Sequence, residues 1–123
     1  MTSVIVDYNS GNLHSAKKSF QLLSLELNQG EVLVSSEIEV ILKAERLILP
    51  GVGSFTDCKA NLLKKTGLFE ALEQRVIGDC VPFLGICVGQ QLMATTGLEN
   101  NSETAGFDWI PGTVAPITPL DQS

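Results

Sequence analysis

The stretch VPFLGICVG, residues 81–89, places a cysteine between two glycines at the end of an apolar run. The run has the length and composition of a buried strand, and helical spacing from Gln90 to Thr95 predicts a helix after it. A nucleophile on a sharp strand-to-helix turn needs small neighbours, because flanking side chains would collide with the adjacent backbone. The pattern predicts a strained turn that presents the thiol of Cys87 at the carboxyl edge of a sheet, where open α/β folds bind ligands.

Short apolar runs alternate with helical segments throughout the preceding 80 residues. The spacing predicts strands over Val4–Tyr8, Glu31–Ser35 and Leu47–Leu49, and helices over residues 13–27, 37–43, 56–65 and 68–77. Apolar strands separated by helices indicate a parallel sheet covered on both faces, with right-handed crossovers. We therefore predict an α/β fold with a doubly wound, mostly parallel sheet.

The sequence changes character after Gly97. Residues 98–106 are polar and acidic, and residues 109–114 (WIPGTV) have the composition of a turn that leads into a new strand. The sequence ends nine residues beyond Val114. We therefore expect that residues 1–123 are the N-terminal portion of a single domain. We also expect the sheet to be incomplete at its C-terminal end.

A second glycine turn follows the strand before the cysteine stretch. Pro50-Gly51-Val52-Gly53 closes the run Leu47–Leu49, so it should lie at the same edge of the sheet as Cys87. Its small residues leave backbone N–H groups open to a ligand, and the N–H of Val88 is available beside the thiol. Such donors stabilise the oxyanion of acyl transfer. The alternative is that both glycine sets are ordinary turns of a parallel sheet.

Composition limits the classes of partner, cofactor and cellular location that the chain could have. Eight Lys and Arg residues against fourteen Asp and Glu give a net charge of −6, which argues against nucleic acid and anionic membranes as partners. No run approaches the length of a membrane-spanning helix, and no secretory signal is visible. The cysteines, Cys58, Cys80 and Cys87, have no metal-binding spacing, and the chain has one histidine, so we expect no metal and no other cofactor. We expect reduced thiols in a cytoplasmic protein, with Cys58 and Cys80 as small core residues.

Residues 82–93, PFLGICVGQQLM, resemble the active-site signature of class I (triad-type) glutamine amidotransferases, whose domain has a flavodoxin-like α/β fold. The resemblance implies that Cys87 forms a glutamyl thioester. It also implies that Gln91 helps to hold the substrate glutamine, and that Gly51, Val52, Gly53 and Val88 surround the reacting carbonyl.

Two further segments, IVDYNSGNL (residues 5–13) and LPGVGSF (residues 49–55), are similar to the glutaminase subunits of imidazole glycerol phosphate synthases, as is the segment 110–112. That resemblance implies a heterodimer in which ammonia from glutamine passes to a (β/α)₈-barrel cyclase in histidine biosynthesis. It places Asn12 near the partner, although a turn and helix cap would also explain this residue. A paralogous amidotransferase that serves another synthase is the alternative.

The chain departs from the family pattern in its histidines. In the family the catalytic His and its orienting Glu lie downstream, whereas His14 is the one histidine here and matches neither position. We predict that His14 is a surface or interface residue and that residues 1–123 alone are inactive. A non-catalytic short form that binds a partner is a second hypothesis. A third is an unrelated α/β hydrolase or chaperone with a cysteine elbow, which Gln91 and the segment 7–13 argue against.

Overall fold

The computed structural model describes residues 1–120 of the chain. Its elements, in chain order, are β1 (Thr2–Val6), α1 (Leu13–Leu27), β2 (Glu31–Ser35), α2 (Ile38–Lys43), β3 (Arg46–Gly51), α3 (Phe55–Leu63), α4 (Leu68–Glu73), the π-helix η1 (Gln74–Gly78), β4 (Phe83–Cys87), α5 (Val88–Gln91), β5 (Ala94–Glu99), β6 (Ser102–Ala105) and β7 (Ile110–Val114).

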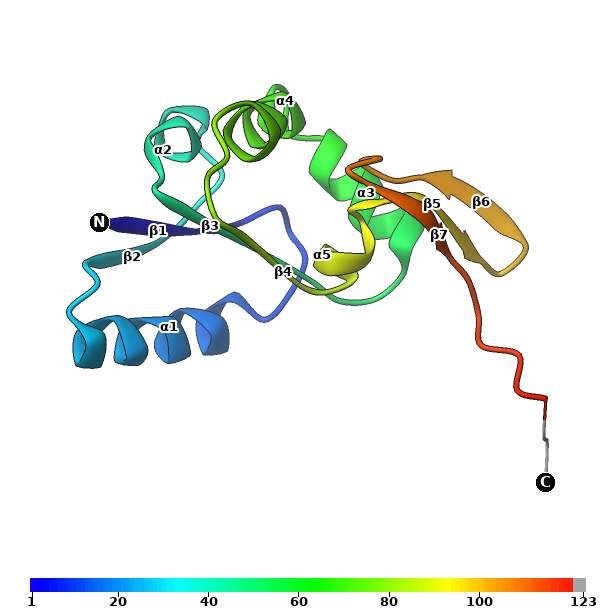
Figure 1. The fold of residues 1–123 in the computed structure, drawn as a ribbon, viewed down its shortest axis with the longest axis horizontal. Coiled ribbons are helices and arrows are strands. Elements are labelled where there is room, and N and C mark those ends of the chain that lie inside the picture. Colours follow the sequence, from blue (N-terminus) through cyan, green and yellow to red (C-terminus); the bar gives the residue numbers. More distant parts are fainter. Residues whose placement is uncertain (121–123) are drawn as a thin grey trace.

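The main sheet has four parallel strands in the order β2-β1-β3-β4 (Figure 1). In its register Val4 pairs with Leu33 on one side and with Leu47 on the other, and Leu47 pairs in turn with Phe83. The chain first places β2 beside β1, then crosses back to add β3 and β4 on the other side of β1. The predicted doubly wound, mostly parallel α/β fold is confirmed.

Helices cover the two faces of this sheet because successive strand residues point to opposite sides. On one face Ile5, Val32 and Ile48 pack against Leu13, Ala16 and Phe20 of α1. On the other face lies the larger core, where strand residues contact side chains from α2, α3, α4 and α5; its fully buried members include Val4, Val6, Ile41, Leu47, Leu49, Leu62, Leu68 and Leu72. Figure 1 shows α1 on one side of the strands and α2 and α4 on the other.

A helix follows the cysteine, as predicted, but the predicted range from Gln90 to Thr95 is wrong. Helix α5 ends at Gln91, and Ala94 begins strand β5. The backbone bonds that would continue the helix are replaced by pairing with a later segment: the N–H of Phe107 donates to the carbonyl oxygen of Leu92 (2.7 Å). Helical spacing of apolar residues could not reveal this tertiary pairing.

A second, three-stranded sheet in the order β6-β5-β7 lies beyond the carboxyl ends of the main strands (Figure 1). The polar stretch 98–106 contains the end of β5, a turn and β6, a hairpin that was not predicted from the sequence. Its two turn residues, Asn100 and Asn101, have φ of 48° and 62°. Such left-handed turns favour asparagine and match the twist of a hairpin. The strand predicted within residues 109–114 is confirmed as β7.

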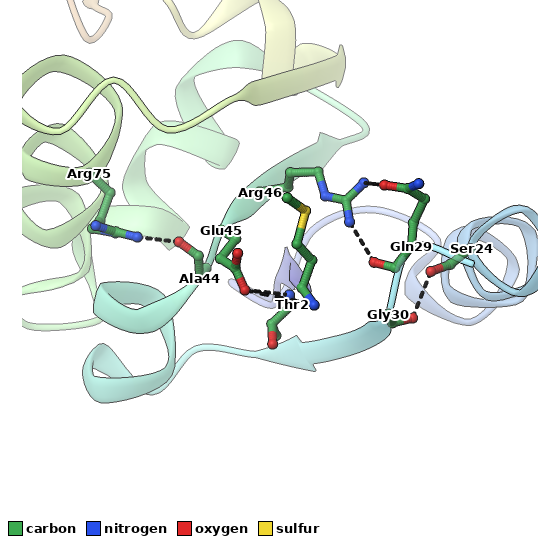
Figure 2. A network of polar contacts seen from close by, with 9 residues as sticks. Thr2, Ser24, Gln29, Gly30, Ala44, Glu45, Arg46 and Arg75 are labelled. Carbon is green, nitrogen blue, oxygen red and sulfur yellow. Dashed lines mark hydrogen bonds and ion pairs between the residues drawn. The ribbon is translucent and has the colours of Figure 1, made fainter. Parts of the chain in front are cut away.

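Polar contacts fasten the opposite, amino edge of the main sheet (Figure 2). The guanidinium of Arg46, at the start of β3, donates to the backbone carbonyl of Gln29 at 2.6 Å. Ser24 Oγ donates to the carbonyl of Gly30 at 2.6 Å, and the N–H of Thr2 donates to the carboxylate of Glu45. These bonds tie the end of α1 and the starts of β1 and β3 together, and they lie away from the cysteine turn.

Strand β4 is the last strand of the main sheet within the described residues, and part of one face is open. Leu84 is 48% exposed and Ile86 is 37% exposed. Their neighbours on β3 and α1, Ile48 and Phe20, are more buried. The α1 layer therefore covers β1, β2 and β3 but leaves β4 partly uncovered.

Candidate active site

Cys87 occupies the junction between β4 and α5, as the last residue of the strand and the N-cap of the helix. Its backbone has φ 58° and ψ −122°, a conformation that non-glycine residues rarely adopt. Its side chain is exposed. The predicted strained strand-to-helix turn with an accessible thiol is present.

The glycines on either side of Cys87 are required by close packing. A Cβ at Gly85 would lie 2.6 Å from the Cα of Gln90, and one at Gly89 would collide with the carbonyl oxygen of Leu49. Both obstacles are backbone atoms, which cannot move aside as a flexible side chain could. Helix α5 can therefore sit directly on β3 and β4 only because these two positions lack side chains.

The second glycine turn lies beside this elbow, as predicted. In the register of β3 and β4, Gly51 is the partner of Cys87 and Pro50 the partner of Ile86. A Cβ at Gly51 would approach the backbone nitrogen of Gly89 to 2.7 Å, so the turn packs against the first residues of α5. Gly53 has φ 91°, and no atom lies within 4 Å of the place that a Cβ would occupy. The turn 51–53 thus begins at the sheet partner of Cys87 and packs against the start of α5.

Three buried side chains, Tyr8, Ser10 and Cys58, contact the backbone of this turn, and none of these contacts was predicted from the sequence. The Tyr8 hydroxyl donates to the carbonyl oxygen of Pro50 at 2.5 Å. Ser10 Oγ lies 3.2 Å from the backbone nitrogen of Val52 and 3.3 Å from its carbonyl oxygen. Cys58 Sγ lies 3.0 Å from Ser10 Oγ and 3.2 Å from the same carbonyl oxygen. The only sign of these contacts in the sequence is that two polar residues, Asn9 and Ser10, directly follow a buried strand.

Burial governs the chemistry of the tyrosine. Tyr8 is fully buried, and desolvation, followed by the neighbouring Cys58 thiol, raises the pKa of its phenol well above the ordinary value. Tyr8 is therefore a neutral hydrogen-bond donor at physiological pH, which suits its contact with the Pro50 carbonyl.

The remaining predicted site residues lie on the same edge of the sheet or close to it. Val88 is the first residue of α5, so its N–H belongs to the helix end and has no acceptor within the helix. Gln91 is half-buried at the end of the same helix, one turn beyond Cys87. Asn12 is the N-cap of α1, where its side chain accepts the N–H of Ser15 at 3.2 Å. His14 is exposed in the first turn of α1, in agreement with the predicted surface position.

One cysteine prediction is confirmed and the other is wrong. Cys58 is buried in the core, but Cys80 is exposed, with φ 58°, in the segment between η1 and β4. Cys80 lies two residues beyond the end of the π-helix, in the connection to β4, and there it is exposed.

Within residues 1–120, no group of His, Cys, Asp and Glu side chains is arranged to hold a metal ion. No helix of that described part has the length and apolar character to cross a membrane. The chemistry that the elbow offers is nucleophilic, because an exposed thiol lies on a strained turn at the start of a helix.

Comparison with known proteins identifies the family. The family model described as "Glutamine amidotransferase class-I" matches residues 4–103, which include both glycine turns and Cys87. The chain belongs to the class I glutamine amidotransferase family. The described fold and the elbow at Cys87 agree with this assignment.

Curated members of this family resemble the chain over nearly its whole length. The chain is 51% identical over 121 residues to the imidazole glycerol phosphate synthase subunit HisH of Cereibacter sphaeroides, an alignment that covers 98% of the chain and 57% of the relative. The subunit HisH of Ruegeria pomeroyi is 50% identical over 119 residues (97% and 56%), and that of Brucella abortus is 42% identical over 124 residues (100% and 57%). The chain therefore spans little more than half the length of the relatives it matches.

Proposed function

We propose that this chain carries the nucleophile of a glutaminase. Cys87 Sγ attacks the side-chain amide carbon of glutamine, and the amide nitrogen leaves as ammonia once it has gained a proton. Water then hydrolyses the glutamyl thioester to glutamate and restores the thiol. The observation that carries the proposal is the strained, exposed position of Cys87 in a chain that belongs to the class I family.

The neighbouring groups have complementary roles in this proposal. The N–H of Val88 and backbone N–H groups of the turn 51–53 stabilise the oxyanion; Val88 directly follows Cys87, and Gly51 is the sheet partner of Cys87. Gln91, half-buried on α5, helps to hold the substrate glutamine. We expect no cofactor, because thioester chemistry needs only the thiol, a general base and oxyanion donors.

The ammonia has a proposed destination. The relatives are named as subunits of imidazole glycerol phosphate synthase, so we propose that the chain is part of the glutaminase subunit of such a synthase. Its partner would be a cyclase subunit of the (β/α)₈-barrel type, in a cytoplasmic heterodimer of histidine biosynthesis whose cyclase step is of the lyase class. Asn12, at the exposed start of α1, is the proposed contact with that partner.

The general base is proposed to come from outside residues 1–123. The chain has one histidine, His14, and its position matches no catalytic histidine of the family. The relatives are longer than the aligned region, so the base and its orienting carboxylate are assigned to that additional length. Residues 1–123 alone should then be inactive, because Cys87 lacks a group to accept its proton and to protonate the leaving ammonia.

The test uses the protein at the full length that its gene encodes, with and without the cyclase subunit of the same organism. Glutamate release from glutamine is the assay. Cys87→Ala should reduce the rate by about 10³-fold or more, whereas Cys80→Ala, a second exposed cysteine, should leave it within about twofold. A glutamine analogue with an electrophilic side-chain carbon should add its mass to Cys87. Unchanged activity in Cys87→Ala, or no glutamate with the cyclase present, would refute the proposal.

A further inference from the structure

We propose that residues 106–110 form a clasp on the end of helix α5, and that Asp108 in this clasp is a positioning residue for Gln91, the proposed contact of α5 with the substrate glutamine. The effect on glutamine binding rests on the proposed function, whereas the contacts of the clasp do not. Helix α5 has four residues, little more than one helical turn. A helix of that length is not stable by itself, so contacts with the rest of the chain determine where its side chains lie.

The start of α5 is held by the main sheet. Gly89 lies against the carbonyl oxygen of Leu49 so closely that there is no room for a Cβ. This contact fixes the end of the helix that is next to Cys87. The place of Gln91, at the other end, depends on what holds the residues that follow it.

Every backbone N–H of residues 106–110 donates to a carbonyl oxygen of residues 92–95, the four residues that follow α5. The bonds run from Phe107 to Leu92 (2.7 Å), from Trp109 and Ile110 to Met93 (2.9 Å each), from Asp108 to Ala94 (3.1 Å) and from Gly106 to Thr95 (2.9 Å). Carbonyl groups at the end of a helix have no partners within it, so a segment from elsewhere can fix that end by supplying N–H groups. The clasp supplies them directly after Gln91.

Asp108 gives the clasp the shape that these bonds require. Its φ is 59°, in the left-handed region, which aspartate tolerates better than most residues with a side chain. Its carboxylate oxygen Oδ1 accepts the hydroxyl of Thr95 at 2.7 Å, and the oxygen of that hydroxyl accepts the N–H of Gly112 at 3.3 Å. The carboxylate thus fastens the clasp to β5, which continues the chain from α5, and to β7.

Contacts on its other side keep the clasp from moving together with α5. Phe107 is buried, and its ring centroid lies 5.1 Å from that of Phe69 in α4. Lys59 Nζ, from α3, donates to the carbonyl oxygen of Gly106 at 3.3 Å. The clasp is therefore anchored to α3 and α4, and α5 is held between this anchor and the main sheet.

Loss of the Asp108 carboxylate should move Gln91 more than Cys87, because the start of α5 stays in place. In the full-length protein with its cyclase subunit, Asp108→Ala should raise KM for glutamine by roughly 5- to 20-fold and lower kcat by less than about threefold. Asp108→Asn keeps an acceptor oxygen and tolerates the left-handed backbone, so both constants should stay within about twofold of the original. Glu103→Ala removes an exposed carboxylate from β6 of the same sheet, and this charge control should also stay within about twofold.

A double substitution separates the positioning of Gln91 from a general structural effect. Gln91→Ala should itself raise KM for glutamine by roughly tenfold. Asp108→Ala added to Gln91→Ala should raise KM by less than about twofold more, because the group that Asp108 positions is already absent. A general loss of structure would instead multiply the two single effects.

A further readout does not need glutaminase activity. Hydrogen exchange at the amides of Phe107 and Trp109, followed by NMR, should be at least about tenfold faster in Asp108→Ala than in the unmodified protein, because the clasp opens more often. Exchange at the amide of Val4, in the strand β1 that is paired on both sides, should change by less than about threefold. This comparison distinguishes local opening of the clasp from unfolding of the whole chain.

Each result decides a different part of the proposal. Unchanged exchange at Phe107 in Asp108→Ala would overturn the clasp even if the protein is a glutaminase. Faster exchange in a protein that releases no glutamate would support the clasp and contradict the proposed function. A rise in KM that is equally large in the Gln91→Ala background, or a fall in kcat alone, would overturn the role of Asp108 in positioning Gln91. If Asp108→Ala does not fold, Thr95→Val, which removes the hydroxyl donor to Asp108, gives the same comparison with Thr95→Ser as its control.

Discussion

Cys87 has a side chain but adopts φ of 58° and ψ of −122°, in a turn with glycines two positions away on either side. Non-glycine residues in such regions are strained by about 1–3 kcal/mol, and the surrounding fold must hold them there. Here the backbone contacts of Gly85 and Gly89 fix α5 against β3 and β4, so the strain persists. A strained backbone at Cys87 lowers stability, so this conformation indicates a functional role for the residue rather than a contribution to stability.

The substitution Cys87→Gly should therefore stabilise the protein. Glycine relieves the strain but adds entropy to the unfolded chain, and the net gain in the free energy of unfolding should be about 1 kcal/mol. Cys87→Ala keeps the Cβ and should change stability by less than about 0.5 kcal/mol. Urea unfolding of the two variants checks this. A loss of stability in Cys87→Gly would show that the thiol itself contributes to packing.

Tyr8 provides a pH-dependent prediction. Burial raises the pKa of its phenol, so above pH of about 10 the folded protein keeps a proton that an unfolded chain releases. The stability that Tyr8 contributes is thus fully present below pH 10 and is lost as the pH rises beyond it. Tyr8→Phe should be less stable by about 1 kcal/mol at neutral pH, through loss of the bond to the Pro50 carbonyl.

The measurement is the free energy of unfolding between pH 8 and pH 11 in both proteins. The difference in the free energy of unfolding between the unmodified protein and Tyr8→Phe should shrink above pH of about 10. Because both proteins have the same lysines, this comparison separates the effect of Tyr8 from that of the lysines that titrate in the same range. Tyr8 is the one tyrosine among the 123 residues, so phenolate absorbance follows it directly in this chain. A phenol that titrates near pH 10 in the folded protein would contradict the burial argument.

At the scale of elements, the second sheet is attached to α3 by polar contacts. Glu99 Oε2 accepts the N–H of Phe55, the first residue of α3, at 2.8 Å. Thr56 and Thr104 share a hydroxyl hydrogen bond of 2.7 Å, and Lys59 Nζ donates to the carbonyl of Ala105 at 2.7 Å. The helix that follows the glycine turn is therefore held by β5 and β6.

Glu99→Ala should destabilise the protein by about 1–3 kcal/mol, because it leaves the N–H of the buried Phe55 without its acceptor and removes a negative charge from a helix N-terminus. Glu103→Ala, an exposed position of β6, is the matched control and should change stability by less than about 0.5 kcal/mol. Thermal or urea unfolding distinguishes them. Equal effects at the two positions would mean that the Glu99 contact contributes nothing beyond surface charge.

The same elements show what sequence patterns could and could not predict. The bounds of α1 and β2 were predicted correctly, because Leu13, Ala16 and Phe20 recur at helical spacing and apolar residues fill the strand. The elbow was predicted because the glycines around Cys87 follow a buried strand, precede helical spacing and are accompanied by a second glycine turn. Strand β5 was missed because its pairing is with residues 102–114, and the contact between Ser10 and Cys58 was missed because these residues are 48 positions apart. Local spacing carries no information about contacts of that range.

At the scale of the whole molecule, α1 covers one face of the main sheet over β1, β2 and β3 but leaves β4 partly uncovered. Leu84 and Ile86 of β4 are partly exposed on the face that α1 covers elsewhere, and β4 forms an edge of the sheet within the described residues. An exposed apolar edge strand is a site of association between chains. As an isolated polypeptide, residues 1–123 should therefore associate through β4 at micromolar concentration.

The substitution Leu84→Lys should shift that polypeptide toward the monomer, because a charge on the open face must be desolvated when two copies meet. Leu25→Lys introduces the same charge at a leucine that is 81% exposed on α1, away from β4, and should leave association unchanged. Size-exclusion chromatography with light scattering, over a range of concentrations, gives the mass of each. If both lysine variants weaken association equally, the effect is one of net charge and β4 is not the contact. If the unmodified polypeptide is monomeric throughout, its edge is protected by the twist and short length of β4, and the exposed leucine is an ordinary surface residue.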